Sequence, residues 1–473
     1  MIRVFLGIPE AFVARAEHVF EVFAQHWGVP LSVSRDPAAD AHVAYQTDDH
    51  ERRHGVVRIR FDERLYDAGC GCVAREHDGH QVWCRPDVDP DAADIVGASH
   101  RLLTFLDEQR VRPEDRDRRG IFRTDALPPA RRRVVDVPVV DHHAAWLLER
   151  LVRTCPRAVD GRLAKWPDGN RYALAVTHDT DAITLGAVPE LATNLAKSVI
   201  GRDRTYAQMF VDGLRYLGDP MGNPLFGFPR WRDFERARHV RSEFYLYARL
   251  GSVKRDIHDC KSSIVEQRID WRVLTGMLAD GWDFGFHAPI NSRSSADAFA
   301  TAKQWLEERL GGPVHGVRHH YWALDWRSPH KTLRMHAETG FRYDGSIAWR
   351  DVSGFRAATC HPFRPFDPEA GEVLDLYELP VCLMDGHVIR DGVSVSGAVD
   401  AALRMIRRVR DLGGVAVLDW HAESACADYV FKRHVATLDG VLAAVADDGD
   451  AWIATPREIV QHWDRRAAAL RDG

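Results

Sequence analysis

Short apolar runs alternate with amphipathic segments over the last two thirds of the chain. Apolar runs predict strands at 172–176, 243–247, 282–286, 314–318, 342–347 and 415–418. Apolar positions spaced three and four residues apart predict helices at 231–239, 269–280, 296–310, 331–339 and 399–412. Alternating strands and helices are typical of a parallel sheet with crossover helices. About seven such βα units over roughly 300 residues favour a (β/α) barrel over an open sheet.

A different pattern occupies the start of the chain. Strand patterns at 2–6, 56–61 and 81–84, with helical periodicity at 11–24 and 92–107, predict a small α/β N-terminal domain over residues 1–120. The charged, proline-containing stretch 112–138 is the best candidate for a boundary. We therefore expect a linker and a helix over 121–164 and the barrel over 165–465. The sequence assigns no role to the N-terminal domain.

Composition narrows the class of protein. The 473 residues suffice for two domains, and 45% hydrophobic and 28% charged residues are ordinary for a soluble globular protein. A net charge of −6 gives no support for a nucleic-acid partner. No apolar run approaches the roughly 20 residues of a membrane helix, and the N-terminus lacks signal-peptide features. The eight scattered cysteines favour reduced thiols, so we expect a cytoplasmic protein without a membrane span. The oligomeric state stays open.

Side chains capable of catalysis follow four of the predicted strands. Each position alone is more typical of turn or capping chemistry. In a barrel, however, the C-terminal ends of the strands share one face, so four coincidences favour one shared site. Paired carboxylates with histidines suit metal-assisted hydrolysis, in which one carboxylate binds a cation and the other takes a proton from water. The residues are Asp179, Asp181, His287, Arg318, His320, Tyr321 and His421.

Four segments in this region resemble the successive motifs of the polysaccharide deacetylase (NodB-homology) family. They are Thr-His-Asp-Thr-Asp at 177–181, Gly-Phe-His-Ala-Pro-Ile-Asn at 285–291, Gly-Val-Arg-His-His-Tyr at 316–321 and Val-Leu-Asp-Trp-His at 417–421. Segment 354–366 is similar to a bacterial subgroup with an extra N-terminal domain. The resemblance implies a distorted (β/α) barrel and a divalent metal, most often zinc. It also implies removal of an acetyl group from an N-acetylated or O-acetylated sugar or polysaccharide.

The resemblance also implies a set of metal ligands. Asp181 and His287 match two of them. Asn291 stands where the family has a second histidine, and an amide oxygen is a weaker ligand than imidazole. His320 replaces the usual proline of its motif and can supply the missing nitrogen, so we expect Asn291 or His320 to complete the shell. His178 and His361 are further candidate ligands, and for each the alternative is a purely structural role.

The remaining matches concern the reaction itself. Asp179 matches the general base, and Arg318 matches the arginine that holds this carboxylate. Tyr321 matches the tyrosine whose backbone N–H binds the oxyanion, and His421 matches the histidine that protonates the leaving amine. Glu378, in the segment Tyr-Glu-Leu-Pro at 377–380, is a candidate for orienting His421.

Two alternatives to a carbohydrate deacetylase stay open. The same barrel can hydrolyse another C–N bond, such as that of a small amide or ureide. The chain can also be a catalytically silent sugar-binding protein, a possibility that Asn291 favours. Trp322, Trp326 and Trp349 in predicted loops either stack on sugar rings or pack in the core.

Overall fold

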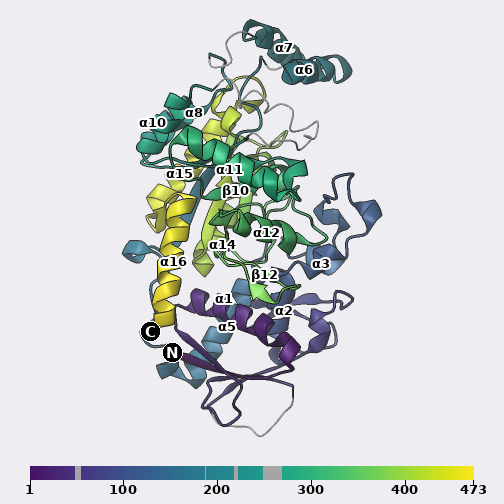
Figure 1. The fold of residues 1–473 in the computed structure, drawn as a ribbon, viewed down its shortest axis with the longest axis vertical. Coiled ribbons are helices and arrows are strands. Elements are labelled where there is room, and N and C mark those ends of the chain that lie inside the picture. The colour runs from purple at the N-terminus through teal and green to yellow at the C-terminus, as the bar shows by residue number, and fades with distance from the viewer. Residues whose placement is uncertain (48–54, 187, 218–221, 249–268, 473) are drawn as a thin grey trace.

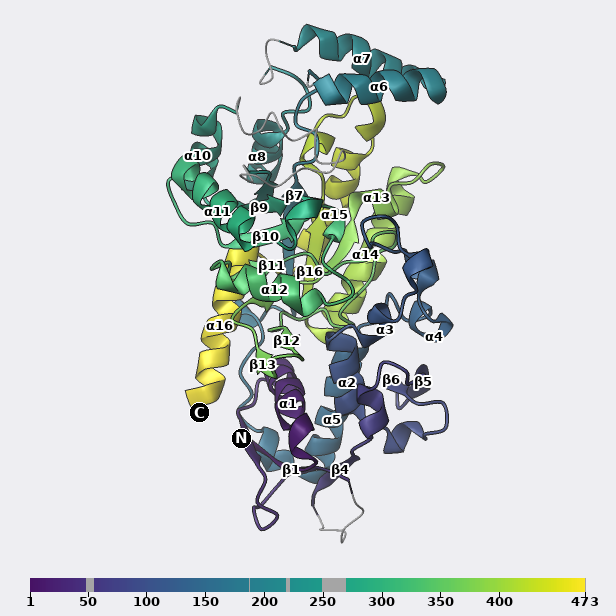
Figure 2. The ribbon, with the colours of Figure 1, turned by 45° about the vertical axis from the view of Figure 1, so that its right-hand side comes forward.

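Two parallel β-sheets organise the structure, a computed structural model that describes residues 1–47, 55–186, 188–217, 222–248 and 269–472. The smaller sheet has the order β2-β1-β3-β4, and the larger has nine strands within the described residues. The smaller sheet lies at the lower end of the elongated molecule, the larger lies above it, and the helices α6 and α7 project at the far end (Figure 2).

The smaller sheet confirms that the first part of the chain is an α/β unit. Its strands are β1 (Ile2–Gly7), β2 (Leu31–Ser34), β3 (Val43–Gln46) and β4 (Val57–Arg60), and all pairings are parallel. Buried and partly exposed positions alternate along β1, as a strand with one covered face requires. The helices α1 (Val13–Trp27), α2 (Ile95–Leu103) and α5 (Val139–Thr154) pack together on it.

The helix predicted at 92–107 is shorter than expected. Phe105 has a φ of 58°, a left-handed conformation that interrupts the helix between α2 and α3 (Leu106–Gln109). A β-hairpin, β5 (Val73–His77) with β6 (His80–Cys84), lies beside these helices, and α4 (Pro129–Arg132) follows.

The larger sheet runs in the order β14-β11-β10-β9-β8-β7-β16-β15, and β17 also pairs with β7. Every pairing in it is parallel. Its strands are β7 (Tyr172–Asp179), β8 (Glu243–Leu246), β9 (Asp283–Ala288), β10 (Gly316–His319), β11 (Tyr343–Asp344), β14 (Tyr377–Glu378), β15 (Val381–Met384), β16 (Val415–Asp419) and β17 (Ala451–Ile453).

The chain itself shows that this sheet curls. β14 and β15 stand at opposite ends of the strand order, yet only Leu379 and Pro380 separate them in the sequence. Because a chain spans at most about 3.5 Å per residue, the two ends of the sheet must come close together. The fold is therefore the distorted (β/α) barrel that the sequence predicted. The nine strands exceed the roughly seven predicted units, and β14, β15 and β17 are the strands that were not predicted.

Helices cover the outside of the barrel (Figure 1). They are α8 (Phe228–Arg236), α10 (Trp271–Ala279), α11 (Ala296–Leu310), α12 (Pro329–Glu338), α14 (Val395–Leu412), α15 (His434–Asp448) and α16 (Pro456–Asp472). Capping residues next to α11 set where this helix begins and ends. Ser295 accepts the N–H of Ala298 at its start, and Gly311 adopts a φ of 72° at its end. The predicted bounds of this helix are confirmed.

The helices α15 and α16 were not predicted, and neither were two helices that lie between β7 and β8. α6 (Val188–Ile200) and α7 (Arg204–Arg215) pack against each other and project beyond the barrel (Figure 1). The remaining short elements are β12 (Phe366–Asp367), β13 (Glu372–Val373) and α13 (Asp385–Val388). No helix in the described ranges combines the length and the apolar character that a membrane crossing requires.

The two sheets share one hydrophobic interior. A single cluster of buried side chains runs from Ile2 in β1 to Leu418 in β16. Helix α16 returns toward the N-terminal part, where Arg466 contacts Gln25 of α1. The boundaries expected at 120 and 165 stay a prediction. The seven cysteines that lie within the described residues are free, and Cys260 lies outside them.

Candidate active site

The side chains predicted to share a site converge around Asp181. Its Oδ1 lies 3.1 Å from His287 Nε2, and its Oδ2 lies 3.2 Å from His320 Nε2. The same Oδ2 lies 3.6 Å from His421 Nε2. These residues come from the C-terminal ends of β7, β9, β10 and β16, so the barrel brings together positions up to 240 residues apart.

Both aspartates of the first motif lie at the C-terminal end of β7, Asp179 as its last residue and Asp181 just beyond it. The strand runs through Asp179, beyond its predicted end, and is buried along its whole length. Asp179 Oδ2 lies 3.9 Å from His287 Nε2, so Asp179 and Asp181 face the same imidazole. Asp181 lies two positions beyond the end of the strand, and its carboxylate still meets that of Asp179 at His287.

The orientation of His287 leaves one ring nitrogen turned to the site. Its Nδ1 lies 3.1 Å from the carbonyl oxygen of Arg318, to which a protonated Nδ1 donates. In that tautomer Nε2 would offer its lone pair to a cation lying between it and Asp181. Metal-ligating histidines commonly have this arrangement, in which a backbone carbonyl fixes the tautomer.

Asp181, His287 and His320 can hold a cation. One ligand atom from each lies within 4.8 Å of the other two. In a tetrahedral shell with bonds of about 2.0–2.1 Å, neighbouring ligand atoms are about 3.3 Å apart, close to the separations seen here. The ring of Tyr247 packs edge-on against His287, with centroids 4.6 Å apart, which limits movement of that ligand. Asn291, on the 3-10 helix Ile290–Ser292, has an exposed side chain. The geometry therefore favours His320 over Asn291 as the third ligand.

Arg318 holds Asp179 in place. The buried guanidinium donates from Nη1 to Asp179 Oδ1 and to Thr177 Oγ1, each at 2.9 Å, and lies 3.3 Å from Asp419 Oδ1. It also lies 4.2 Å from the ring centroid of Tyr245. Burial lowers the pKa of this guanidinium, but the charges of Asp179, Tyr245 and Asp419 outweigh burial and raise it above its ordinary value. Arg318 thus remains a cation beside Asp179.

His421 is held by a carboxylate that the sequence analysis missed. His421 Nδ1 lies 3.0 Å from Asp385 Oδ1, and its backbone N–H donates to Asp385 Oδ2 at 3.0 Å. Burial raises the pKa of Asp385, but the charge of His421 and its hydrogen bonds outweigh burial and lower it to about 2. Burial lowers the pKa of His421, but Asp385 and Asp181 outweigh it and hold this pKa well above its ordinary value. His421 is therefore an imidazolium in this arrangement.

The prediction that Glu378 orients His421 is wrong. Glu378 Oε1 accepts the backbone N–H of Ile347 at 3.1 Å, and burial with the charge of Asp344 raises the pKa of Glu378 well above its ordinary value. Asp385 follows β15, in the same way as the other site residues follow their strands. The same rule identifies it once β15 is recognised.

Other predicted candidates have different surroundings. His178 is stacked between Trp231 and Phe244, and its Nε2 lies 2.8 Å from Glu235 Oε1, so it is a structural residue. His361 belongs to a second cluster with His26, described below. Trp322, Trp326 and Trp349 have exposed fractions of 5%, 1% and 2%, so they pack in the core and offer no face to a sugar.

The backbone next to His320 is unusual. Tyr321 and Trp322 both have positive φ, at 57° and 50°, which is uncommon for residues other than glycine and recurs at functional sites. The ring of Tyr321 stacks on His320, with centroids 4.3 Å apart, and Arg350 lies 5.3 Å from the Tyr321 centroid. This loop presents Tyr321 at the edge of the ligand group.

Two further buried acids lie beside the site. Burial and the charge of Asp179 raise the pKa of Asp419 to about 8. Burial, and to a lesser degree Asp181, raises the pKa of Glu423 to about 8. The site thus concentrates carboxyl groups whose ionisation depends on the neighbouring cations, as active sites commonly do.

Known proteins were compared with the whole chain. No protein-family model matches it, and no curated protein matches it. Polysaccharide deacetylases are among the similar solved structures. A protein from Mycobacterium smegmatis described in this way has 20% identity and a TM-score of 0.42, over 64% of this chain and 93% of that one. Another from Pseudomonas aeruginosa has 15% identity and a TM-score of 0.40, over 63% and 93%. An allantoinase has 13% identity and a TM-score of 0.39, over 63% and 92%.

Proposed function

We propose that the protein is a metal-dependent hydrolase that removes an acetyl group from an N-acetylated or O-acetylated sugar or glycan. One observation carries the proposal: the candidate cation ligands lie between Asp179 and His421. Arg318 holds the Asp179 carboxylate, and Asp385 holds the His421 ring. Asp179 Oδ2 lies 3.9 Å from His287 Nε2, and His421 Nε2 lies 3.6 Å from Asp181 Oδ2. A base and an acid thus flank one centre.

Asp181, His287 and His320 would hold the cation. Two imidazoles and a carboxylate are a common ligand set for zinc in hydrolases, which keep further positions open for water and substrate. When bound, the cation supplies Lewis acidity for the acetyl carbonyl and for a water molecule. Asn291, at the position of the family's second histidine, lies outside this set in our proposal.

Asp179 would act as the general base. Its Oδ1 is occupied by Arg318 at 2.9 Å, which leaves Oδ2 turned to the centre. The hydrogen bond from Arg318 thus fixes the orientation in which Asp179 would accept a proton. Proton transfer to a positioned base contributes typically 10²–10⁴-fold to a rate.

His421 would act as the general acid. An amide nitrogen leaves as an amine only after it gains a proton, and His421 holds a proton on Nε2 toward the centre while Nδ1 bonds Asp385. Asp385 is a positioning residue because it acts through this imidazole. The backbone N–H of Tyr321 would receive the developing oxyanion, a role that rests on the motif resemblance.

Acetate release with elemental analysis tests the proposal. We expect about one divalent ion bound through Asp181 and His287, and acetate release from N-acetylated sugars. Asp179→Asn and His421→Ala should each lower the rate on the order of 10²–10⁴-fold. Metal content should stay unchanged in His421→Ala.

The alternatives give different results in the same assay. Release of ammonia from small amides or ureides without acetate release indicates another C–N hydrolase. Sugar binding without turnover of any acetylated substrate indicates a silent binding protein. Rates of both variants within a few-fold of wild type would refute the assigned base and acid.

A further inference from the structure

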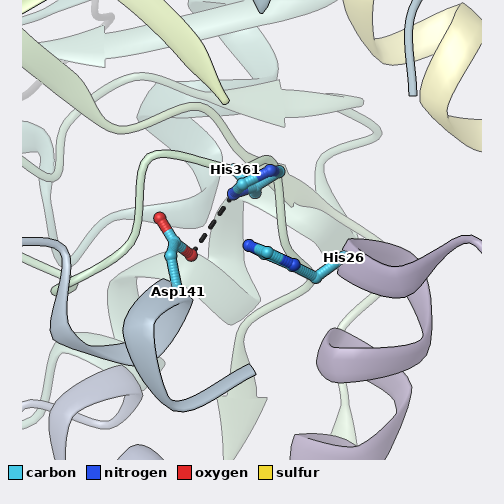
Figure 3. Close-up of side chains that lie close together, drawn as sticks. All are labelled: His26, Asp141 and His361. Atoms are coloured by element: carbon cyan, nitrogen blue, oxygen red, sulfur yellow. Dashed lines mark ion pairs between the residues drawn. The ribbon is translucent and has the colours of Figure 1, made fainter. Parts of the chain in front are cut away.

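A second cluster of buried ligand-type side chains lies where the N-terminal helices meet the barrel. His26 comes from α1, Asp141 from α5 and His361 from the segment before β12, so three distant parts of the chain meet here (Figure 3). One ligand atom of each residue lies within 4.8 Å of the other two. The exposed fractions are 7% for His26, 1% for Asp141 and 3% for His361. The cluster is thus an interior feature that joins two parts of the fold.

His26 contains a buried polar atom that has no hydrogen-bond partner among the described residues. This atom is its Nε2. Figure 3 shows the ring of His26 pointing toward the pair formed by Asp141 and His361. The two imidazole centroids are 4.3 Å apart. Buried polar atoms in proteins almost always have a partner, so an occupant of the space beside this nitrogen is expected.

The other two residues present ligand atoms at a suitable spacing. His361 Nδ1 lies 3.3 Å from Asp141 Oδ1. That separation equals the edge of a tetrahedral shell with bonds of about 2.0–2.1 Å. Asp141 Oδ1 accepts one hydrogen bond, from Thr359 Oγ1 at 2.6 Å, and a carboxylate oxygen has a second lone pair for a cation. Cys360 Sγ lies 4.0 Å from His361 Nδ1, so a fourth side chain is within reach.

We propose that His26, Asp141 and His361 form a second metal site that takes a divalent transition-metal ion, with zinc as the chemical match. Two imidazole nitrogens and one carboxylate oxygen suit zinc rather than calcium or magnesium, which prefer oxygen ligands. The ligands are buried on three segments, so the ion has a structural role. Through His26 and Asp141, the ion links α1 and α5 of the N-terminal part to the segment that carries His361.

Lys165 defines the competing arrangement. Its Nζ lies 3.3 Å from His361 Nε2 and donates to the carbonyl oxygen of Leu412 at 2.8 Å. A chain in which Lys165 donates to His361 and His361 donates to Asp141 needs no metal. That chain leaves His26 Nε2 without a partner, whereas the metal site pairs all three residues. Because a nearby ammonium repels a dication, Lys165→Met should bind zinc more tightly than wild type.

Metal counting on the full chain tests the proposal. After chelation and titration with zinc, wild type should bind about two ions per chain. His26→Phe keeps an aromatic ring but removes the nitrogen, and it should lose about one ion while acetate release persists. His18→Phe, on the same helix, is the matched control and should bind as many ions as wild type. His287→Ala should lose the other ion, so the two sites are separable.

Equal zinc binding by His26→Phe and wild type would overturn the proposal. Anomalous diffraction at the zinc edge on wild-type crystals gives a second measurement that needs no variant. A peak bonded to His26 Nε2, Asp141 and His361 Nδ1 supports the site. Its absence from crystals grown with zinc, together with a peak at Asp181, would overturn the second site and leave the proposed function intact.

Discussion

Replacing Asp385 with asparagine removes a charge from beside His421 without changing the shape of the side chain. In the structure, Asp385 accepts from both the ring Nδ1 and the backbone N–H of His421, each at 3.0 Å. If His421 is the general acid, its protonated form must persist at the working pH. Asp385→Asn should therefore move the alkaline limb of the pH profile of kcat/KM to lower pH.

The distance sets the size of this shift. At 3.0 Å and an effective dielectric constant of about 20, the attraction is about 5–6 kcal/mol, an upper value for this pair. The His421 side chain is 21% exposed, so solvent screens part of the attraction. A neighbouring opposite charge commonly shifts a pKa by about 1–3 units, or about 1.4–4 kcal/mol. We expect the alkaline limb to move down by this amount.

Two measurements check the shift. The pH profile of kcat/KM for acetate release gives the position of the alkaline limb. NMR titration of the His421 ring gives the pKa of His421 in the absence of substrate. Glu378→Gln is the matched control, because burial and Asp344 already hold Glu378 neutral, and it should leave the limb in place. An alkaline limb at the same pH in Asp385→Asn and wild type would refute the pairing of Asp385 with a catalytic His421.

Three further predictions follow from the same contacts. Arg318→Met should lower the free energy of unfolding in urea by about 3–5 kcal/mol, because it leaves the buried Asp179 without its cation. His320→Ala should weaken metal binding at the active site by about tenfold or more in an equilibrium titration, whereas Asn291→Ala should leave it unchanged; the reverse ranking would reassign the third ligand. The pKa of Asp385 is about 2 in the folded chain, so its ionised form stabilises the fold above pH ~4, and this contribution of about 2 kcal/mol is lost as pH falls toward 2. Acid unfolding of wild type and Asp385→Asn should differ accordingly, and coincident curves would contradict the assignment.

Much of the site could be predicted because its residues obey one local rule. Asp179, His287, Arg318 and His421 stand at the ends of buried strands whose apolar runs are visible in the sequence. In a parallel barrel these ends share one face, so residues that follow different strands lie close together although they are far apart in the sequence. The ends of α11 are equally local, because Ser295 and a glycine terminate it.

The missed features depend on contacts that local patterns do not contain. Pro380 lies between β14 and β15, and a proline within an apolar run argues against a central strand, so no strand was predicted before Asp385. The three tryptophans in predicted loops carry no signal that distinguishes burial from exposure. The cluster around His26 arises where α1, α5 and the segment carrying His361 meet, and no spacing in the sequence reports that junction.

Acetate release before and after metal removal tests the central proposal most directly. Wild-type protein should release acetate from an N-acetylated sugar, lose this activity on chelation, and regain it when a divalent metal is restored. His287→Ala, which lacks a proposed ligand, should not regain activity under the same conditions. Acetate release that persists in the chelated, metal-free protein would contradict the account.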